Sequence, residues 1–403
     1  MRLIPVIVMA ALVASCGTAK KTADAAPEGA APVVESLKAV PDGARDVIKK
    51  PDVSLEKLAF SANLLKEAYV QAPKGNIILS PYSAGVAFSM LTDGARNRTR
   101  KGLITALSRS SYYGEFPYRD SVYTVKTANS VWLNAGLVAK DNYIGTLKNG
   151  YNAQVFSADA GDPFTAEAVN KWCGEHTEGL IDKLLDTLDP TNRMILMNAL
   201  YFKAPWALPF SKERTFKEVF HGEEGDADVD FMHATTKGFR YGRLNGATLV
   251  NLPYKDGRYA MLIAVPDDMA AFFEDFSPAT FDKALDALQQ GEVALSLPKF
   301  KLEASKRLNE IMTALGAGEV FTPAADLSGI SDEALFVNLA FQKCVLEVNE
   351  EGSEAAAVTV IMMTRATAVS LEPVPIRVDK PFLFAIYDTK TKEILFEGKI
   401  ADI

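Results

Sequence analysis

The chain has 403 residues, of which 48% are apolar and 23% charged, a composition typical of a globular protein with a large core. Its formal charge of −8 gives no general attraction to nucleic acid or anionic lipid, so we expect no nucleic-acid partner. Because the sequence contains no internal repeat and no second linker, we expect one large domain after an N-terminal tail.

The N-terminus has the pattern of an export signal. Arg2 is followed by an apolar stretch, residues 3–14, that is too short to span a bilayer as a stable helix, and small residues precede Cys16. The segment resembles a bacterial lipobox, which implies that residues 1–15 are a lipoprotein signal peptide and that Cys16 is lipidated. An ordinary secretory signal is the alternative. Both interpretations predict export, and the lipobox predicts a membrane-anchored bacterial lipoprotein on the outer membrane or cell surface.

Residues 16–52 differ in composition from the rest of the chain. They are rich in Ala, Pro and charged residues and lack aromatic residues, so they cannot bury enough surface to fold. We interpret them as a disordered tether between the lipid and a domain over residues 53–403. Within the domain, leucines at helical spacing predict a helix that begins near Ser54, and Pro81 in a first-turn position predicts a second helix after Ser80.

The rest of the domain contains many predicted strands. Segments rich in Val, Ile and Phe, or alternating polar with apolar residues, are bounded by Gly, Pro, Asn or Asp. Two helical stretches, residues 166–183 and 304–315, fall between them without a regular strand–helix–strand rhythm, which favours an α+β fold with mostly antiparallel sheets. The predicted strands cover residues 125–133, 194–202, 248–252, 259–266, 293–297, 337–348, 377–378, 382–387 and 394–400.

Sequence signatures of catalysis are missing. The three histidines, His176, His221 and His233, have neither metal-ligand nor nucleophile–base spacing, and there is no HExxH site, P-loop or GxSxG turn. We therefore expect a protein that is not an enzyme and that holds no cofactor or metal.

Two cysteines remain besides Cys16. An exported protein could pair Cys173 with Cys344 in a disulfide. Each of the two lies inside a periodic apolar segment, where cysteine behaves as a small hydrophobic residue. We therefore expect two buried free thiols.

Motifs spread over the whole domain resemble those of the serpin family, and they follow one another in the family's order. The resemblance covers about residues 53–403. It implies a serpin fold of three β-sheets with eight or nine helices, an exposed reactive-centre loop at about residues 352–373, and a native form that is only kinetically trapped. The motifs lie at residues 76–83 (NIILSPYS), 127–133 (TANSVWL), 170–172 (NKW), 198–206 (NALYFKAPW), 252–254 (LPY), 297–300 (LPKF), 326–330 (DLSGI) and 379–382 (DKPF).

The resemblance also implies which residues lie where the central sheet must part when it opens. All but one map beneath the sheet, and Trp206 maps to its top. At position 342 the family commonly has a His in a hydrogen-bond network with a Ser and an Asn. Gln342 offers both a donor and an acceptor, so the network could survive this substitution. The sheet-opening residues are Ser80, Pro81, Ser83, Asn198, Trp206 and Gln342.

A segment after the strand predicted at residues 337–348 resembles the hinge of inhibitory serpins. If the chain beyond Gly352 becomes an extra strand inside a sheet, its side chains alternate between the core and the outer face. Ser353, Ala355 and Ala357 are small enough to enter a packed interior, and no Pro interrupts a ladder from residue 352 to 372. The hinge comprises Gly352, Ser353, Glu354, Ala355, Ala356, Ala357 and Val358.

The resemblance implies a suicide-substrate inhibitor of serine proteases, in which the loop inserts into the central sheet after an acyl-enzyme has formed. Counting from Gly352 with the family's spacing places the cut between Ala366 and Thr367. One residue less places it between Arg365 and Ala366. Ala suits an elastase-like protease and Arg a trypsin-like one, so both bonds stay open, and residues 362–364 remain candidates for other proteases.

The expected partners are a covalently bound target serine protease and, through the lipid, a membrane. We expect the protein itself to be a monomer. The alternative function is that of a non-inhibitory serpin acting as a binding or carrier module. Such a protein would be expected to carry bulky, charged or Pro residues in its hinge, and this sequence does not.

Overall fold

The structure is a computed structural model that describes residues 35–36, 54–112, 114–119, 121–176, 179, 183, 185–353 and 372–403. Cys16 and the predicted signal peptide lie outside these residues, as does most of the predicted tether. Within the tether, β1 (Glu35–Ser36) is described, and it pairs antiparallel with the edge strand β4 (Ala153–Ala158). No helix in the described part of the chain is long and apolar enough to cross a membrane.

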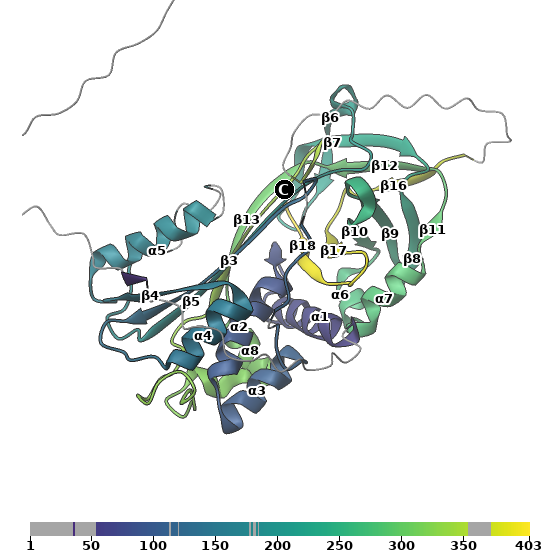
Figure 1. The fold of residues 1–403 in the computed structure, drawn as a ribbon. Coiled ribbons are helices and arrows are strands. Elements are labelled where there is room, and N and C mark those ends of the chain that lie inside the picture. Colours follow the sequence, from purple (N-terminus) through teal and green to yellow (C-terminus); the bar gives the residue numbers. More distant parts are fainter. Residues whose placement is uncertain are drawn as a thin grey trace, which may run out of the picture.

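Eight α-helices in the described residues flank the sheets (Figure 1). Ser80 caps the second of them, because its side chain accepts a hydrogen bond from the Ser83 amide, and Pro81 occupies the first turn, where no N–H is needed. A capping box between Ser277 and Thr280 starts the seventh. The helices are α1 (Ser54–Gln71), α2 (Pro81–Gly94), α3 (Asn97–Leu107), α4 (Asp141–Tyr151), α5 (Pro163–His176), α6 (Met269–Glu274), α7 (Pro278–Asp286) and α8 (Asn309–Met312).

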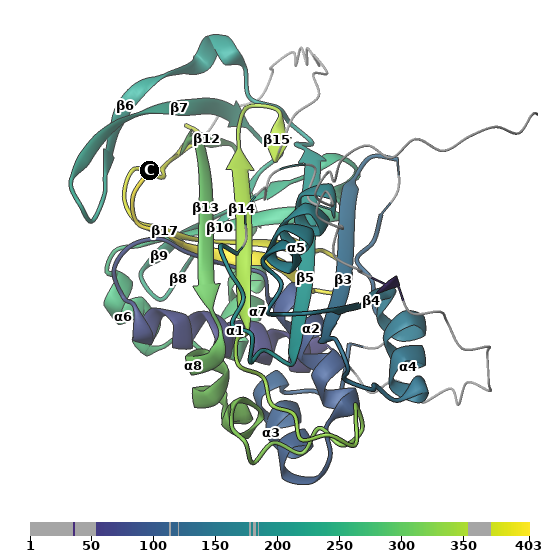
Figure 2. The same ribbon diagram turned by 90° about the vertical axis from the view of Figure 1, so that its left-hand side faces the viewer.

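In the described residues the strands form four hydrogen-bonded sheets, mostly antiparallel, which confirms the predicted α+β class. Two of them lie edge to edge and are called here the two halves of the central sheet (Figure 2). One half contains, in order, β1, β4, β3 (Thr124–Asn134), β5 (Met194–Pro205) and β15 (Gly352–Ser353), and the other contains β14 (Phe341–Val348) and β13 (Phe300–Arg307). The second sheet contains β11 (Gln289–Gln290), β8 (Arg240–Leu244), β9 (Ala247–Pro253), β10 (Tyr259–Pro266), β17 (Phe382–Asp388), β18 (Ile394–Ile400) and β2 (Ile77–Leu79). The third contains β16 (Val374–Arg377), β12 (Val293–Pro298), β7 (Asp226–Thr236) and β6 (Thr215–His221).

Three predicted elements were wrong in type or extent. The sequence predicts a helix over residues 304–315, but β13 continues to Arg307 and the short α8 follows. Side chains of β13 alternate between more and less exposed, and its ladder with β14 imposes this period of two. The strand predicted at residues 337–348 begins only at Phe341. The strand predicted at residues 377–378 lies earlier in the chain, because β16 covers Val374–Arg377.

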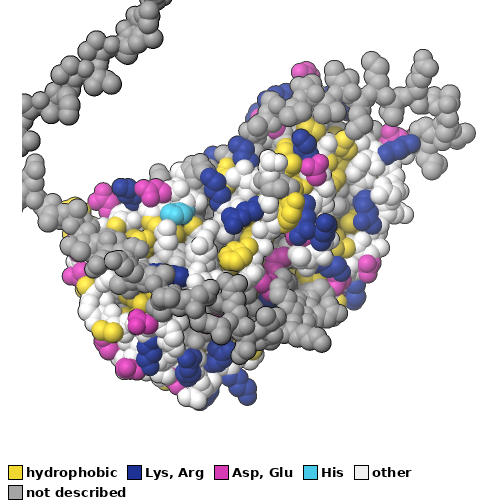
Figure 3. Space-filling model, viewed as in Figure 1, with side chains coloured by type: hydrophobic (Ala, Val, Ile, Leu, Met, Phe, Trp, Pro, Cys, Tyr) yellow, Lys and Arg dark blue, Asp and Glu magenta, His cyan; other side chains and the backbone are white. Residues whose placement is uncertain are grey.

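The apolar core has two parts. Strands β10, β17 and β18 of the second sheet are buried along their whole length and belong to the larger part, which also contains Cys344. A smaller cluster lies between α5 and the central sheet and includes Trp132, Trp172 and Cys173. Cys173 and Cys344 are both buried thiols that are not joined in a disulfide, as expected. On the outside, Figure 3 shows acidic and basic side chains interspersed over much of this face.

Candidate functional site

The central sheet is divided along its middle. Strand β5 forms a continuous antiparallel ladder with β3 on one side, and β14 forms one with β13 on the other. Among the described residues, no ladder joins β5 to β14, although the two strands approach each other. Each strand therefore turns backbone N–H and C=O groups towards a slot that a further strand could fill.

The first residues of the predicted hinge already occupy the top of this slot. Gly352 pairs with Pro205 and Ser353 with Ala204, both antiparallel, at the end of β5. Gly352 has φ +152°, and a Cβ atom there would lie 2.1 Å from the Ala204 carbonyl oxygen, so only glycine fits. The Ser353 side chain is buried, and its hydroxyl lies 2.7 Å from that of Tyr254.

Trp206, which the family resemblance places at the top of the sheet, contacts the turn that leads into the hinge. Its ring stacks on the fully buried Tyr254 with centroids 4.4 Å apart. Its indole N–H donates to the Asn349 carbonyl at 3.0 Å, and its backbone N–H donates to the Glu351 carbonyl at 2.9 Å. Trp206 thus links the end of β5 to the turn between β14 and β15.

Two ion pairs flank the same turn. The ammonium group of Lys299 lies 3.0 Å from the buried carboxylate of Glu350, and Lys212 lies 2.9 Å from Glu351 at the surface. Burial alone would raise the pKa of Glu350, but its backbone hydrogen bond and the hydrogen bond from Lys299 hold that pKa below its ordinary value. The ionised carboxylate of Glu350 therefore stabilises the path of the chain into the hinge.

At the base of the slot, the start of α2 is bonded to both halves of the sheet. Gln342 on β14 forms two hydrogen bonds with the Ser80 backbone, accepting from its N–H at 2.8 Å and donating to its C=O at 2.9 Å. Ser83 donates to Asn198 on β5, and Asn198 donates to Asn129 on β3. In the described structure, Gln342 therefore bonds to the backbone of Ser80. The side-chain hydrogen bonds from Ser83 through Asn198 to Asn129 do not include Gln342.

The sequence-predicted site residues that the structure describes lie at the two ends of the slot. Ser80, Pro81, Ser83, Asn198 and Gln342 are at its base, whereas Trp206, Gly352 and Ser353 are at its top. The other predicted hinge and scissile-bond residues lie outside the described residues: Glu354, Ala355, Ala356, Ala357, Val358, Arg365, Ala366 and Thr367.

The sequence analysis missed three residues that contact the hinge or the two residues just before it. These residues are Tyr254, which bonds to Ser353, and Lys212 and Lys299, which pair with Glu351 and Glu350. Tyr254 and Lys299 both lie in the matched motifs at residues 252–254 and 297–300, which was the available signal. Their contacts with residues about 50 to 100 positions later could not be read from spacing.

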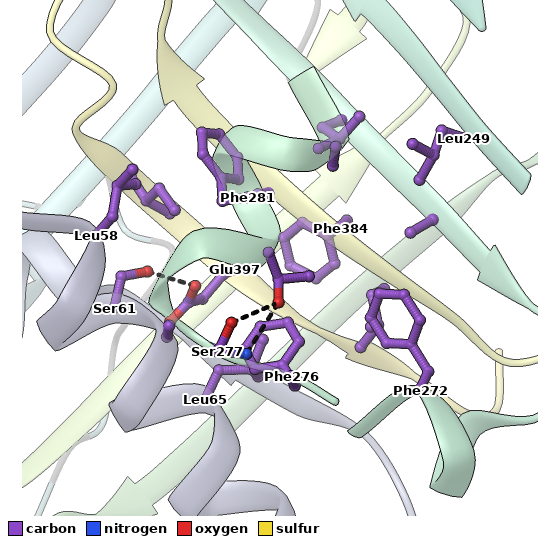
Figure 4. A pocket seen from close by; sticks show the side chains of 18 residues that line it. Leu58, Ser61, Leu65, Leu249, Phe272, Phe276, Ser277, Phe281, Phe384 and Glu397 are labelled. Carbon is purple, nitrogen blue, oxygen red and sulfur yellow. Dashed lines mark hydrogen bonds between the residues drawn. The ribbon is translucent and has the colours of Figure 1, made fainter. Parts of the chain in front are cut away.

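A separate apolar pocket lies between α1, α7 and the second sheet (Figure 4). Its walls are almost entirely apolar, with Leu65 and Phe384 among them, but Glu397 also lines it. One carboxyl oxygen of Glu397 accepts a hydrogen bond from Ser61 at 2.6 Å, while the other, Oε1, is buried and has no hydrogen-bond partner. Burial raises the pKa of Glu397 to about 8.

The described residues contain no group of His, Cys, Asp and Glu side chains that could hold a metal ion. The described side chains around the slot form hydrogen bonds and ion pairs. The facing edges of β5 and β14, which form no ladder with each other in the described residues, leave room for a further strand.

Comparison with known proteins identifies the family. Residues 56–403 match the serpin family, described as serine protease inhibitor. Iripin-3 of Ixodes ricinus is 36% identical over 82% of this chain and 89% of its own. A serpin-like protein of Thermococcus kodakarensis is 31% identical over 91% of this chain and 90% of its own.

Solved structures agree with this assignment. The native state of the thermophilic serpin tengpin has a TM-score of 0.81 and 27% identity, covering 91% of this chain and 98% of its own. A complex of thyroxine-binding globulin with thyroxine has a TM-score of 0.77 and 25% identity, covering 87% of this chain and 99% of its own. The chain therefore belongs to the serpin family of serine protease inhibitors.

Proposed function

We propose that the protein is a suicide-substrate inhibitor that traps a serine protease as a covalent acyl-enzyme. The observation that carries this proposal is the parted central sheet, whose slot already holds Gly352 and Ser353 at its top. We call the reactive-centre loop, at about residues 352–373, the bait. Once the bait is cut, its N-terminal part could extend the pairing of Gly352 and Ser353 along the slot. The serpin itself supplies the scissile bond and the strand, and the protease supplies every catalytic group.

The register of the hinge supports insertion along the whole slot. Continuing the pairing of Ser353 with Ala204 would bring residue 363 opposite Met194, where β5 begins. The alternation that buries Ser353 would also turn the small side chains of Ala355 and Ala357 inwards. The candidate cut sites, residues 365–367, follow directly after the segment that such a strand would use.

Insertion would release free energy from two sources. Each new ladder hydrogen bond contributes about 1 kcal/mol, and burial of the apolar side chains of the loop adds to this. The protease remains attached to the end of the moving strand, so it is carried away from its docking position and distorted before deacylation. We infer an elastase-like target if the cut follows Ala366 and a trypsin-like target if it follows Arg365.

Incubation with trypsin and with an elastase, followed by denaturing electrophoresis, tests the proposal. We expect a covalent band with at least one of them, and mass spectrometry of the released peptide identifies the cut bond. We also expect the nicked protein to unfold at a higher temperature than the intact one. Clean cleavage by a broad panel of serine proteases, with no covalent band and no gain in thermal stability, would falsify the inhibitory mechanism.

A second candidate function, that of a small-molecule carrier, is favoured by the apolar pocket with Glu397. The similarity to thyroxine-binding globulin, solved with thyroxine, is consistent with it. The small residues of the hinge favour inhibition instead. A carrier would form no covalent complex with proteases and would bind a small apolar ligand with equal affinity before and after removal of the bait.

We further propose that Cys16 is lipidated and anchors the inhibitor to a bacterial outer membrane or cell surface. The support is the lipobox-like segment that ends at Cys16, followed by a stretch with the composition of a tether. In the native host, the wild-type protein is expected in the membrane fraction and a Cys16→Ser variant in the soluble fraction. Equal membrane retention of both would argue against lipid anchoring.

A further inference from the structure

A row of polar side chains crosses the third sheet from its edge strand. Ser296 on β12 lies directly opposite Arg377 on β16 and directly opposite His233 on β7. The Ser296 hydroxyl and Nδ1 of His233 are 3.0 Å apart. The row therefore begins on β16, which is the first strand after residue 353 that the structure describes.

Glu218 on β6 closes the row from the far side of the sheet. Its Oε2 accepts a hydrogen bond from Nη2 of Arg377 at 2.6 Å, and its Oε1 lies 3.1 Å from Nε2 of His233. The ring of Phe216 stacks on the imidazole with centroids 4.2 Å apart. Only 14% of the His233 side chain and 18% of the Glu218 side chain are exposed, so a charge on the imidazole would be poorly screened.

Besides this row, β16 is held by its pairing with one neighbouring strand and by the buried side chains of Ile376 and Val378. Among the described strands, β16 is an edge strand that pairs with β12 alone, in parallel, over Val374–Arg377. Two flanking backbone hydrogen bonds, from the amides of Val374 and Val378, extend this pairing. The side chain of Arg377 ties β16 to the distant strand β6 through Glu218, and just beyond β16 the backbone N–H of His221 on β6 donates to the Asp379 carbonyl at 2.8 Å.

We propose that the Arg377–Glu218–His233 row is an acid-sensitive clasp on β16, and that proton uptake by His233 favours detachment of this strand. The consequence for inhibition rests on the proposed function, because β16 would be the C-terminal anchor of the bait. Detachment would leave the C-terminal end of the bait without this anchor.

The surroundings of His233 give the direction of the effect. Burial lowers the pKa of His233 below its ordinary value of 6.5; Glu218 raises this pKa, whereas Arg214 and Arg377 lower it, and Asp379 shares the Arg377 side chain. When β16 leaves, Arg377 leaves with it and the imidazole becomes more exposed, so its pKa rises. By linkage, the protonated ring favours the detached strand, and the clasp weakens as the pH falls below about 6.5.

Hydrogen exchange of the full protein tests the clasp without a protease. Protection factors are measured for a peptide covering residues 372–381 and, as an internal reference, for β18, at pH 7.5 and pH 5.5. In the wild type we expect protection of β16, relative to β18, to fall by roughly three- to tenfold over this interval. The His233→Gln variant should lose this pH dependence, and the matched control His221→Gln, whose histidine is exposed on β6, should keep it.

A second variant keeps the test informative if His233→Gln folds poorly. Arg377→Gln should loosen β16 at both pH values and flatten the pH dependence, because the coupling acts through this charge. Equal protection of β16 at both pH values in the wild type, or an unchanged acid effect in His233→Gln, overturns the clasp. Because exchange needs no protease, an acid effect without any covalent complex would refute the proposed function and leave the clasp standing.

Discussion

The hydroxyl groups of Tyr254 and Ser353 lie 2.7 Å apart in a fully buried environment, and they join the second sheet to the second residue of the predicted hinge. Ser353 therefore enters the central sheet with its polar atom satisfied. Without this partner, a buried hydroxyl would cost about 1–3 kcal/mol. The contact thus stabilises the partly inserted hinge.

A Tyr254→Phe variant should loosen the hinge. The substitution removes the partner of the Ser353 hydroxyl and keeps the ring that stacks on Trp206. We expect exchange of the Ser353 amide to accelerate by roughly five- to hundredfold, the equivalent of about 1–3 kcal/mol. In the Ser353→Ala background, where no hydroxyl needs a partner, the same substitution should have a much smaller effect, and equal effects in both backgrounds would contradict this assignment.

A Ser353→Arg variant should turn the proposed inhibitor into a substrate. The side chain at this position is buried against Tyr254, and an unpaired guanidinium cannot enter that space without a large cost. We expect the covalent complex, measured on a denaturing gel, to decrease at least about tenfold while the cleaved product increases. The control Ser353→Ala should keep most of the complex. Undiminished complex formation by Ser353→Arg would count against insertion at this point.

A Lys299→Gln variant should destabilise the native state. It leaves the carboxylate of Glu350, which is buried, without its cation. We expect the free energy of unfolding, measured in urea, to fall by about 1–3 kcal/mol. Lys301→Gln is a matched control two residues further along the chain, because its pair with Glu347 is more exposed and should contribute less than about 1 kcal/mol. Equal losses for both variants would show that the buried pair has no special role.

A Glu397→Gln variant should change how stability depends on pH. Burial raises the pKa of Glu397 to about 8 from its ordinary value of 4.5, so the unfolded chain binds fewer protons here between these two values. The wild type should therefore lose stability as the pH rises through this window. The variant should melt at a higher temperature than the wild type at pH 8 and at a similar temperature at pH 4. The exposed control Glu274→Gln should follow the wild type, and parallel curves for Glu397→Gln and wild type would refute the raised pKa.

Several features of the fold and site could be predicted because they depend on local sequence. The two helices predicted to begin near Ser54 and after Ser80 begin where expected, Ser80 caps the second of them, and the α+β class follows from the order of the segments. The small residues of the hinge indicate a segment suited to a packed sheet before any partner strand is known. The helix predicted over residues 304–315 failed, because pairing with β14 outweighed the local helical pattern.

The sequence by itself determined the family, because ordered motifs carry it, and it predicted the alternation of the hinge and an export signal from neighbouring residues. Only the tertiary structure decided that the central sheet is parted between β5 and β14, that Gln342 bonds to the Ser80 backbone, and that Arg377 reaches Glu218 across the third sheet. Periodicity specifies which face of a strand a side chain occupies. Which distant residue it meets there is set by strand register and sheet order, and these arise only when the whole domain packs.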